Sequence, residues 1–150
     1  MSAKKQPRIL IIEDNESNHP LFKAAFTAKG FEVVISQNGD GDFITDVLAI
    51  KPDIISMDLM LGKPNVDLER DGFDILKLLQ EDERTTNIPV FILTSFFAED
   101  KVQKALALGA TDFISLPGHA MGTVPNFFLE YLEHPKRYKP VNPLFAAAHT

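Results

Sequence analysis

Short, uniformly apolar runs that alternate with amphipathic stretches constrain the fold of this chain more than any other feature. The run Ile9–Ile12 is too short for a helix and too apolar for a strand with one face in water, so it predicts a strand buried on both faces. Further strands are predicted at 31–36, 53–57, 90–93 and 112–115. Apolar residues at helical spacing predict helices over 16–29, 42–50, 72–80, 99–108 and 124–133. This alternation specifies an α/β fold, a doubly wound five-stranded parallel sheet with five helices and right-handed crossovers.

Composition narrows the class of protein further. The chain has 150 residues, a net charge of −6 and no cysteine, which excludes disulfides, thiolate metal sites and cysteine nucleophiles. The acidic balance disfavours nucleic acid as a partner. No apolar run approaches the roughly 18 residues that span a bilayer, and the polar N-terminus does not resemble a signal peptide. We therefore expect a cytoplasmic protein with no nucleic-acid or membrane partner.

The strand and helix pattern also predicts the domain organisation. Residues 8–133 carry all the predicted strands and helices, and 1–7 precede them as a short N-terminal extension. The segment 134–150 is rich in proline and shows no helix or strand pattern, so it is interpreted as a C-terminal tail, ordered or loose. Phe145 in this tail and the pair Phe96-Phe97 are either contact points for a partner or ordinary core positions.

Acidic residues follow two of the predicted strands directly. Glu13 and Asp14 end the first strand, and Asp58 ends the third. If the strand order is 2-1-3-4-5, these two strands are neighbours, and their carboxyl ends form the edge where ligands bind in such sheets. Like charges so close together raise one another's pKa unless a cation neutralises them. Three acids without histidine or cysteine favour Mg²⁺ over zinc.

Each of these acids has an ordinary structural alternative. Glu13 and Asp14 could serve as helix caps or turn residues. Asp58 is followed by Leu-Met-Leu, opens no predicted helix and so has no evident capping role. Thr94, at the end of the fourth strand, could donate its hydroxyl to an oxyanion held over Asp58, or could simply be a β-branched strand residue.

Four segments in this order and spacing resemble the receiver domain of response regulators in two-component signalling. They are 9–15, 52–58, 88–95 and 109–113, and the resemblance extends over about 8–133. It implies the flavodoxin-like fold with strand order 2-1-3-4-5. It also implies a phosphoprotein of a phosphorelay, with Asp58 as the phospho-acceptor. Glu13, Asp14, Asp58 and the backbone carbonyl of Met60 would then bind Mg²⁺.

The resemblance implies a readout and partners as well. Thr94 corresponds to the switch hydroxyl and Phe113 to the aromatic switch position. The phosphoryl donor would be a sensor histidine kinase or a histidine phosphotransfer protein, and output would pass to a downstream protein partner. A homodimer through the fourth helix, fifth strand and fifth helix is a further expectation.

Two positions depart from the pattern of that family. Leu116 stands where receivers usually carry a lysine that pairs with the phosphoryl oxygen. The loop after Asp58 is longer than usual through the insertion 62–71, which is either a tolerated surface loop or a segment that selects partners or forms a lid over the phosphorylation site. Lys63 or Arg70 in this loop could replace the missing cation, although solvation of both is favoured.

Three functions remain open from the sequence. The leading one is a stand-alone, non-enzymatic response regulator, since only the tail follows the last predicted helix. The alternative is a degenerate receiver that docks partners without phosphorylation, which Leu116 favours. An aspartate-nucleophile phosphatase would need a second aspartate two residues after Asp58, where Met60 stands, and no glycine-rich phosphate loop follows the first strand.

Overall fold

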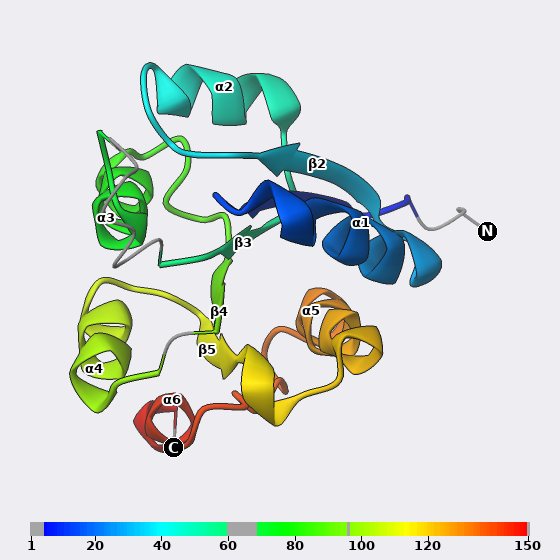
Figure 1. The fold of residues 1–150 in the computed structure, drawn as a ribbon. Helices are drawn as coiled ribbons and strands as arrows, with labels where there is room; N and C mark the ends of the chain where they lie inside the picture. Colours follow the sequence, from blue (N-terminus) through cyan, green and yellow to red (C-terminus); the bar gives the residue numbers. More distant parts are fainter. Residues whose placement is uncertain (1–4, 60–68, 96, 150) are drawn as a thin grey trace.

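The central sheet has the predicted topology. The computed structural model describes residues 5–59, 69–95 and 97–149. Five parallel strands lie in the order β2-β1-β3-β4-β5 (Figure 1). Their bounds are β1 Arg8–Ile12, β2 Glu32–Ser36, β3 Ile54–Met57, β4 Val90–Thr94 and β5 Asp112–Ser115. The adjacency of β1 and β3, which the site requires, is therefore confirmed.

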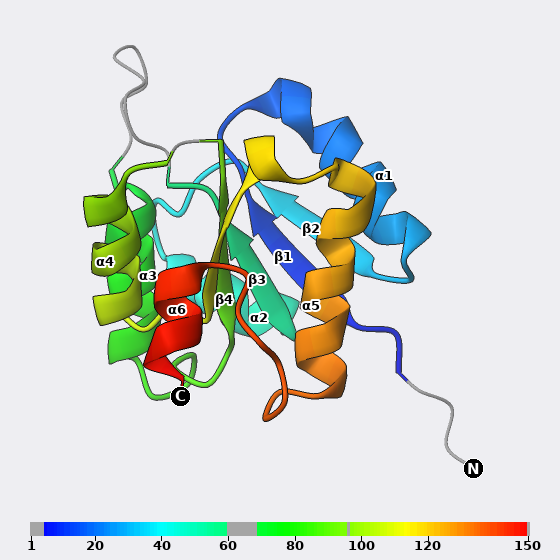
Figure 2. The same ribbon diagram turned by 90° about the horizontal axis from the view of Figure 1, so that it is seen from below.

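Helices cover both faces of the sheet. Their bounds are α1 His19–Ala28, α2 Phe43–Ile50, α3 Gly72–Glu81, α4 Glu99–Ala107, α5 Val124–Glu133 and α6 Pro143–Ala148. α1 and α5 lie on one face, whereas α3, α4 and α6 lie together on the other (Figure 2). None of the described helices is long and apolar enough to cross a membrane.

Alternation along β1 explains why its residues are all apolar. Leu10 and Ile12 pack into the cluster that contains residues of α2, α3 and α4, whereas Ile9 and Ile11 pack into the cluster with α1 and α5. All four side chains are at most 1% exposed. A strand between two layers of helices needs apolar residues on both faces, as the sequence predicted.

The first helix begins differently from the prediction. A short 3₁₀ turn, Glu16–Asn18, precedes α1, and the Asn15 side chain caps it by accepting a hydrogen bond from the Ser17 backbone N–H at 3.1 Å. Asn18 is the N-cap residue of α1, so the helix starts three residues after the predicted start at residue 16. Pro20 lies in the first turn, where its missing N–H costs nothing.

The C-terminal tail folds onto the domain, which the sequence did not predict. It contains the short helix α6, and the Asn142 side chain caps it by accepting from the Leu144 N–H at 2.9 Å. Phe145 is fully buried in the same cluster as Phe113 and Val102, so it is a core residue. α6 lies beside α4 (Figure 2).

A buried carboxylate fastens the tail to β5. Asp112 is fully buried and accepts hydrogen bonds from the Tyr138 hydroxyl at 2.6 Å, the Val141 N–H at 2.6 Å and the Asn142 N–H at 3.1 Å. Tyr138 packs in the cluster of α1 and α5, whereas Phe145 packs in the opposite cluster. The tail therefore crosses the edge of the sheet at β5 and joins the two cores, which also protects that edge strand from outside pairing.

Candidate functional site

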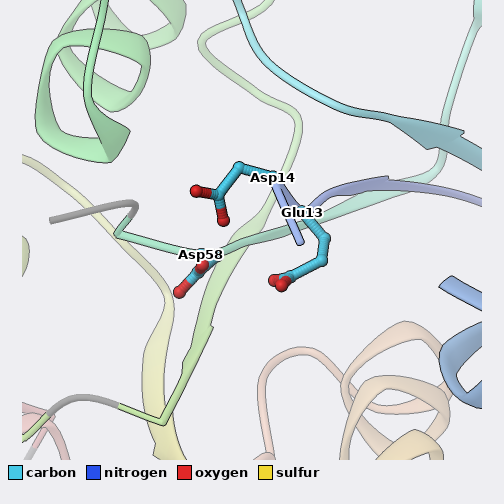
Figure 3. A group of neighbouring side chains, drawn as sticks. All are labelled: Glu13, Asp14 and Asp58. Carbon is cyan, nitrogen blue, oxygen red and sulfur yellow. The ribbon is translucent and has the colours of Figure 1, made fainter. Parts of the chain in front are cut away.

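Three carboxylates from the ends of β1 and β3 meet at the carboxyl edge of the sheet. Glu13 and Asp14 follow β1, and Asp58 follows β3. One ligand oxygen from each lies within 4.8 Å of the others, and the side chains turn into a common space (Figure 3). Backbone pairing fixes this geometry, because the Asp58 N–H donates to the Ile12 carbonyl at 3.0 Å. The convergence predicted for these three acids is confirmed.

The electrostatics of the cluster favour a proton or a cation. Burial, and next the nearby charge of Glu13, raise the pKa of Asp58 to about 7, although a hydrogen bond with the Thr94 side chain acts in the opposite direction. Burial also raises the pKa of Glu13, against the Asn18 amide, which donates to its carboxylate at 2.9 Å. Glu13 and Asp14 are only 4% and 8% exposed. Negative charge so crowded and desolvated is costly unless it is neutralised.

The donor set fits Mg²⁺. The three acids offer only oxygen ligands, which a hard cation such as Mg²⁺ prefers. No lysine or arginine is among the described residues that line the neighbouring cavity, so none of those lining residues neutralises the cluster as an ion-pair partner. Met60, whose carbonyl was predicted as a further ligand, lies outside the described residues.

The two predicted switch residues lie on neighbouring strands. Thr94 ends β4, is buried, and its side chain is hydrogen bonded with Asp58. Phe113 on β5 pairs with Ile92 of β4 and is 1% exposed. Thr94 is thus in direct contact with the acidic cluster, whereas Phe113 lies deeper in the core that contains Phe145.

A cavity of about 370 Å³ opens beside Asp58. Its lining includes Glu13, Ser95 and the apolar side chain of Leu116, the residue that stands in place of the usual lysine. His119 and Met121 line the same cavity. His119 was not among the site residues predicted from the sequence. The signal that could have found it is its position three residues after Leu116, across a Pro-Gly turn.

Arg70 does not serve as a cation beside Asp58. Its Nη1 atom donates to the carbonyls of Gly39 and Gly41, each at 2.8 Å, and its backbone N–H donates to the Asp40 carboxylate at 3.2 Å. The guanidinium is partly exposed, and it ties the loop after β3 to the loop after β2. Lys63 and most of the insertion lie outside the described residues.

Gly72 at the start of α3 lies against the backbone of Asp58 and Leu59. A Cβ atom there would come within 2.6 Å of the Asp58 carbonyl oxygen and 2.8 Å of the Leu59 Cα. Both neighbours are backbone atoms, so the start of α3 or the end of β3 would have to move. A glycine at this position is thus required by close packing.

We expect Gly72→Ala to disturb the acidic cluster and the fold together. The forced shift should lower the free energy of unfolding by about 1–3 kcal/mol. It should also weaken Mg²⁺ binding about tenfold, because metal sites tolerate little displacement of their ligands. Chemical denaturation and Mg²⁺ titration measure the two effects. Gly122→Ala is the matched control, since a Cβ at Gly122 meets nothing within 4 Å. Equal behaviour of the two variants would contradict the prediction.

Comparison with known proteins identifies the family. Residues 9–120 match the family model of the response regulator receiver domain. The chain therefore belongs to the receiver domains of two-component signalling, a family in which phosphorylation and Mg²⁺ binding are common features. Its members interact with histidine kinases or phosphotransfer proteins and with downstream effectors. The family is generally non-enzymatic.

Several curated proteins are similar to this chain. The polar-differentiation response regulator DivK of Brucella anthropi is 31% identical over 109 residues, which cover 73% of this chain and 83% of DivK. The response regulator PleD of Caulobacter vibrioides is 33% identical over 73% of this chain but only 23% of its own length. A protein-glutamate methylesterase/protein-glutamine glutaminase of Myxococcus xanthus is 32% identical over 79% of this chain and 32% of its own length. The chain thus spans about a third of the length of the Myxococcus xanthus protein and about a quarter of the length of PleD.

Solved structures agree with the fold. The receiver domain of a signal transduction histidine kinase from Syntrophus aciditrophicus has a TM-score of 0.70 at 26% identity, covering 91% of this chain and 97% of that domain. The receiver domain of a DNA-binding response regulator from Colwellia psychrerythraea has a TM-score of 0.69 at 25% identity, covering 85% and 98%.

Proposed function

We propose that this chain is the phosphoryl-accepting component of a phosphorelay, with Asp58 as the acceptor. The observation that carries the proposal is the convergence of Glu13, Asp14 and Asp58 within 4.8 Å at the ends of β1 and β3. The donor would be a phosphohistidine on a sensor kinase or a histidine phosphotransfer protein, and the setting would be cytoplasmic. Output would pass by contact to a downstream protein.

The residues of the acidic cluster would have different roles in phosphoryl transfer. An oxygen of the Asp58 carboxylate attacks phosphorus, the phosphorus–nitrogen bond of the phosphohistidine breaks, and the leaving imidazole takes up a proton. Glu13 and Asp14 would hold Mg²⁺, which when bound neutralises charge on the acids and on the transferring oxygens. In the unmodified protein, burial raises the pKa of Asp58 to about 7, so ionisation of its carboxyl is unfavourable without a neutralising charge. Its reactivity therefore depends on that neutralisation.

Thr94 and Phe113 would read out the acyl phosphate. The new group adds a charge of about −1.5 to −2 beside the end of β4. Thr94 already contacts Asp58 and can donate its hydroxyl to a phosphoryl oxygen. Because Phe113 pairs with Ile92 two residues before Thr94, movement at the end of β4 reaches the core between α4 and β5. The charge of the phosphoryl group would thus shift the conformational equilibrium of the packed region around β4 and β5.

The position of the C-terminal tail affects which surface of the domain a downstream protein can contact. Residues 138–148 pack over β5 and against α4, with Phe145 in the same core as Phe113. A homodimer through α4, β5 and α5 would have to displace this segment from the part of the face that it covers. We therefore place such a dimer second to contact with a different protein partner.

Reaction with a small phosphodonor tests the proposal. In the presence of Mg²⁺, acetyl phosphate should add one phosphoryl group to the full chain, detected as a mass increase, and Asp58→Asn should abolish it. Asp46→Asn, a substitution of an exposed carboxylate on α2, is the matched control and should react normally. Phosphorylation that persists in Asp58→Asn would overturn the assignment of the acceptor.

The docking module is the second candidate, and Leu116 in the cavity beside Asp58 favours it. If a folded protein with saturating Mg²⁺ is not modified by acetyl phosphate and does not bind beryllofluoride, the docking module replaces the leading proposal. Turnover of a model phosphate ester that is lost in Asp58→Asn would instead indicate a phosphatase.

A further inference from the structure

No lysine or arginine is among the described residues that line the cavity beside Asp58. Leu116 projects an apolar side chain into it, and the acids Glu13 and Asp58 line the same space. A phosphoryl group on Asp58 would increase the negative charge there, and desolvated anions need hydrogen-bond donors or positive charge. The compensating donor must therefore come from another residue that faces this cavity.

His119 reaches the same cavity by a short turn. Residues Leu116–Gly118 form one turn of 3₁₀ helix, and the His119 N–H closes it by donating to the Leu116 carbonyl at 3.0 Å. With three residues per turn, side chains three positions apart project to the same side. The structure agrees, because Leu116 and His119 both line the cavity that Asp58 lines.

Packing holds the His119 ring in this place. The ring stands edge-on against Phe127 of α5, with centroids 5.3 Å apart and an interplanar angle of 78°. The side chain is half-buried, so the imidazole is ordered yet in contact with the cavity. A ring fixed in this way loses little rotational freedom when it binds an anion.

Two other basic side chains of the described residues already have hydrogen-bond partners. Arg70 donates to the carbonyls of Gly39 and Gly41, and His19 contacts the Glu13 carbonyl through Nε2 at 2.7 Å. His119 is the one basic side chain among the described residues that line this cavity.

We propose that His119 binds the phosphoryl group on Asp58 by donating an imidazole N–H to one of its oxygens, in place of the lysine that Leu116 replaces. An imidazole carries at least one N–H in either charge state, so the contact does not require a protonated ring. The inference rests on the proposed function of Asp58 and adds a phosphoryl-binding residue to that site. A purely structural role for His119 would consist of its packing on Phe127.

Beryllofluoride binding to the full chain separates these two roles. Affinity is measured at saturating Mg²⁺ by calorimetry or by ¹⁹F NMR. His119→Phe keeps an aromatic ring against Phe127 but removes the donor, and His119→Gln keeps a donor on a flexible side chain without a ring. His119→Lys restores a cationic donor, and Leu116→Lys in the His119→Phe background restores one at the usual position. His134→Gln, at an exposed histidine at the end of α5, is the control.

We expect His119→Phe to weaken beryllofluoride binding about 10- to 150-fold, the usual effect of losing a hydrogen bond to a charged group. His119→Lys and the double variant should recover most of the loss, and His134→Gln should bind like the unmodified chain. Full affinity in His119→Phe, or a loss that neither lysine restores, would overturn the role of His119. If the unmodified chain itself fails to bind, the proposed function of Asp58 fails instead, so the two failures are distinguishable.

Discussion

Phe145→Ala should lower the free energy of unfolding by about 3–5 kcal/mol, a large effect for a residue five positions from the C-terminus. Its ring is fully buried in the cluster that contains Phe113, Val102 and Ala105. Truncation removes the transfer free energy of the ring and leaves a cavity that rigid strands cannot close. Urea denaturation followed by circular dichroism measures the change.

Leu144→Ala is the matched control for this prediction. Leu144 precedes Phe145 on the same short helix but is only partly buried, so its loss should cost about 1 kcal/mol. Equal, small effects of both substitutions would show that α6 does not stay docked in solution. The wider consequence concerns output, because a docked tail determines which part of the α4–β5 surface a partner can reach.

The stability of the Mg²⁺-free protein should fall as the pH rises from 5 to 8. The pKa of Asp58 is about 7 in the folded chain against an ordinary value of 3.8, so the folded state holds a proton that the unfolded state has already released. The folded state binds more protons across this interval, and stability is therefore lost as pH rises towards 7. After allowance for the half-buried position of Asp58, we expect a decrease of about 1–3 kcal/mol.

Mg²⁺ should reverse this trend. Binding requires ionised carboxylates, so the stabilisation by a fixed Mg²⁺ concentration should grow with pH over the same interval. Thermal unfolding at a series of pH values, with and without Mg²⁺, measures both effects. Asp58→Asn should flatten the pH profile of the Mg²⁺-free protein, because it removes the carboxyl with the largest shift. A free energy of unfolding that rises from pH 5 to 8 without Mg²⁺ would contradict the prediction.

The strands and most of the helices were predictable because each depends on local pattern. β5 at Asp112–Ser115 and α5 at Val124–Glu133 have the predicted bounds. Gly30 and Gly109, which come directly after the predicted helices 16–29 and 99–108, have positive φ angles of 94° and 92°, as is usual for a glycine that ends a helix. Errors occurred where competing caps lie side by side, as at Asn15, Ser17 and Asn18, because several of these residues can accept the same backbone donor.

The folded C-terminal tail is a feature that the local sequence pattern could not predict. Asn142 followed by Pro143 is a helix-start signal, yet six residues are too few for a recognisable apolar period. The tail docks through the buried carboxylate of Asp112 and the ring of Phe145, whose partners lie far away in the sequence. No spacing rule relates such residues.

The sequence by itself placed Glu13, Asp14 and Asp58 at one edge of a parallel sheet, because all three follow apolar strands whose carboxyl ends such a sheet aligns. The strand order that makes these strands neighbours was implied by the resemblance to receiver domains, and the structure has it. Only the tertiary structure decided that Arg70 is bound to Gly39 and Gly41, that the tail covers β5, and that His119 lines the cavity beside Asp58. Those outcomes depend on how loops and helices pack against one another across the fold, where contact is set by shape and hydrogen bonding and not by position along the chain.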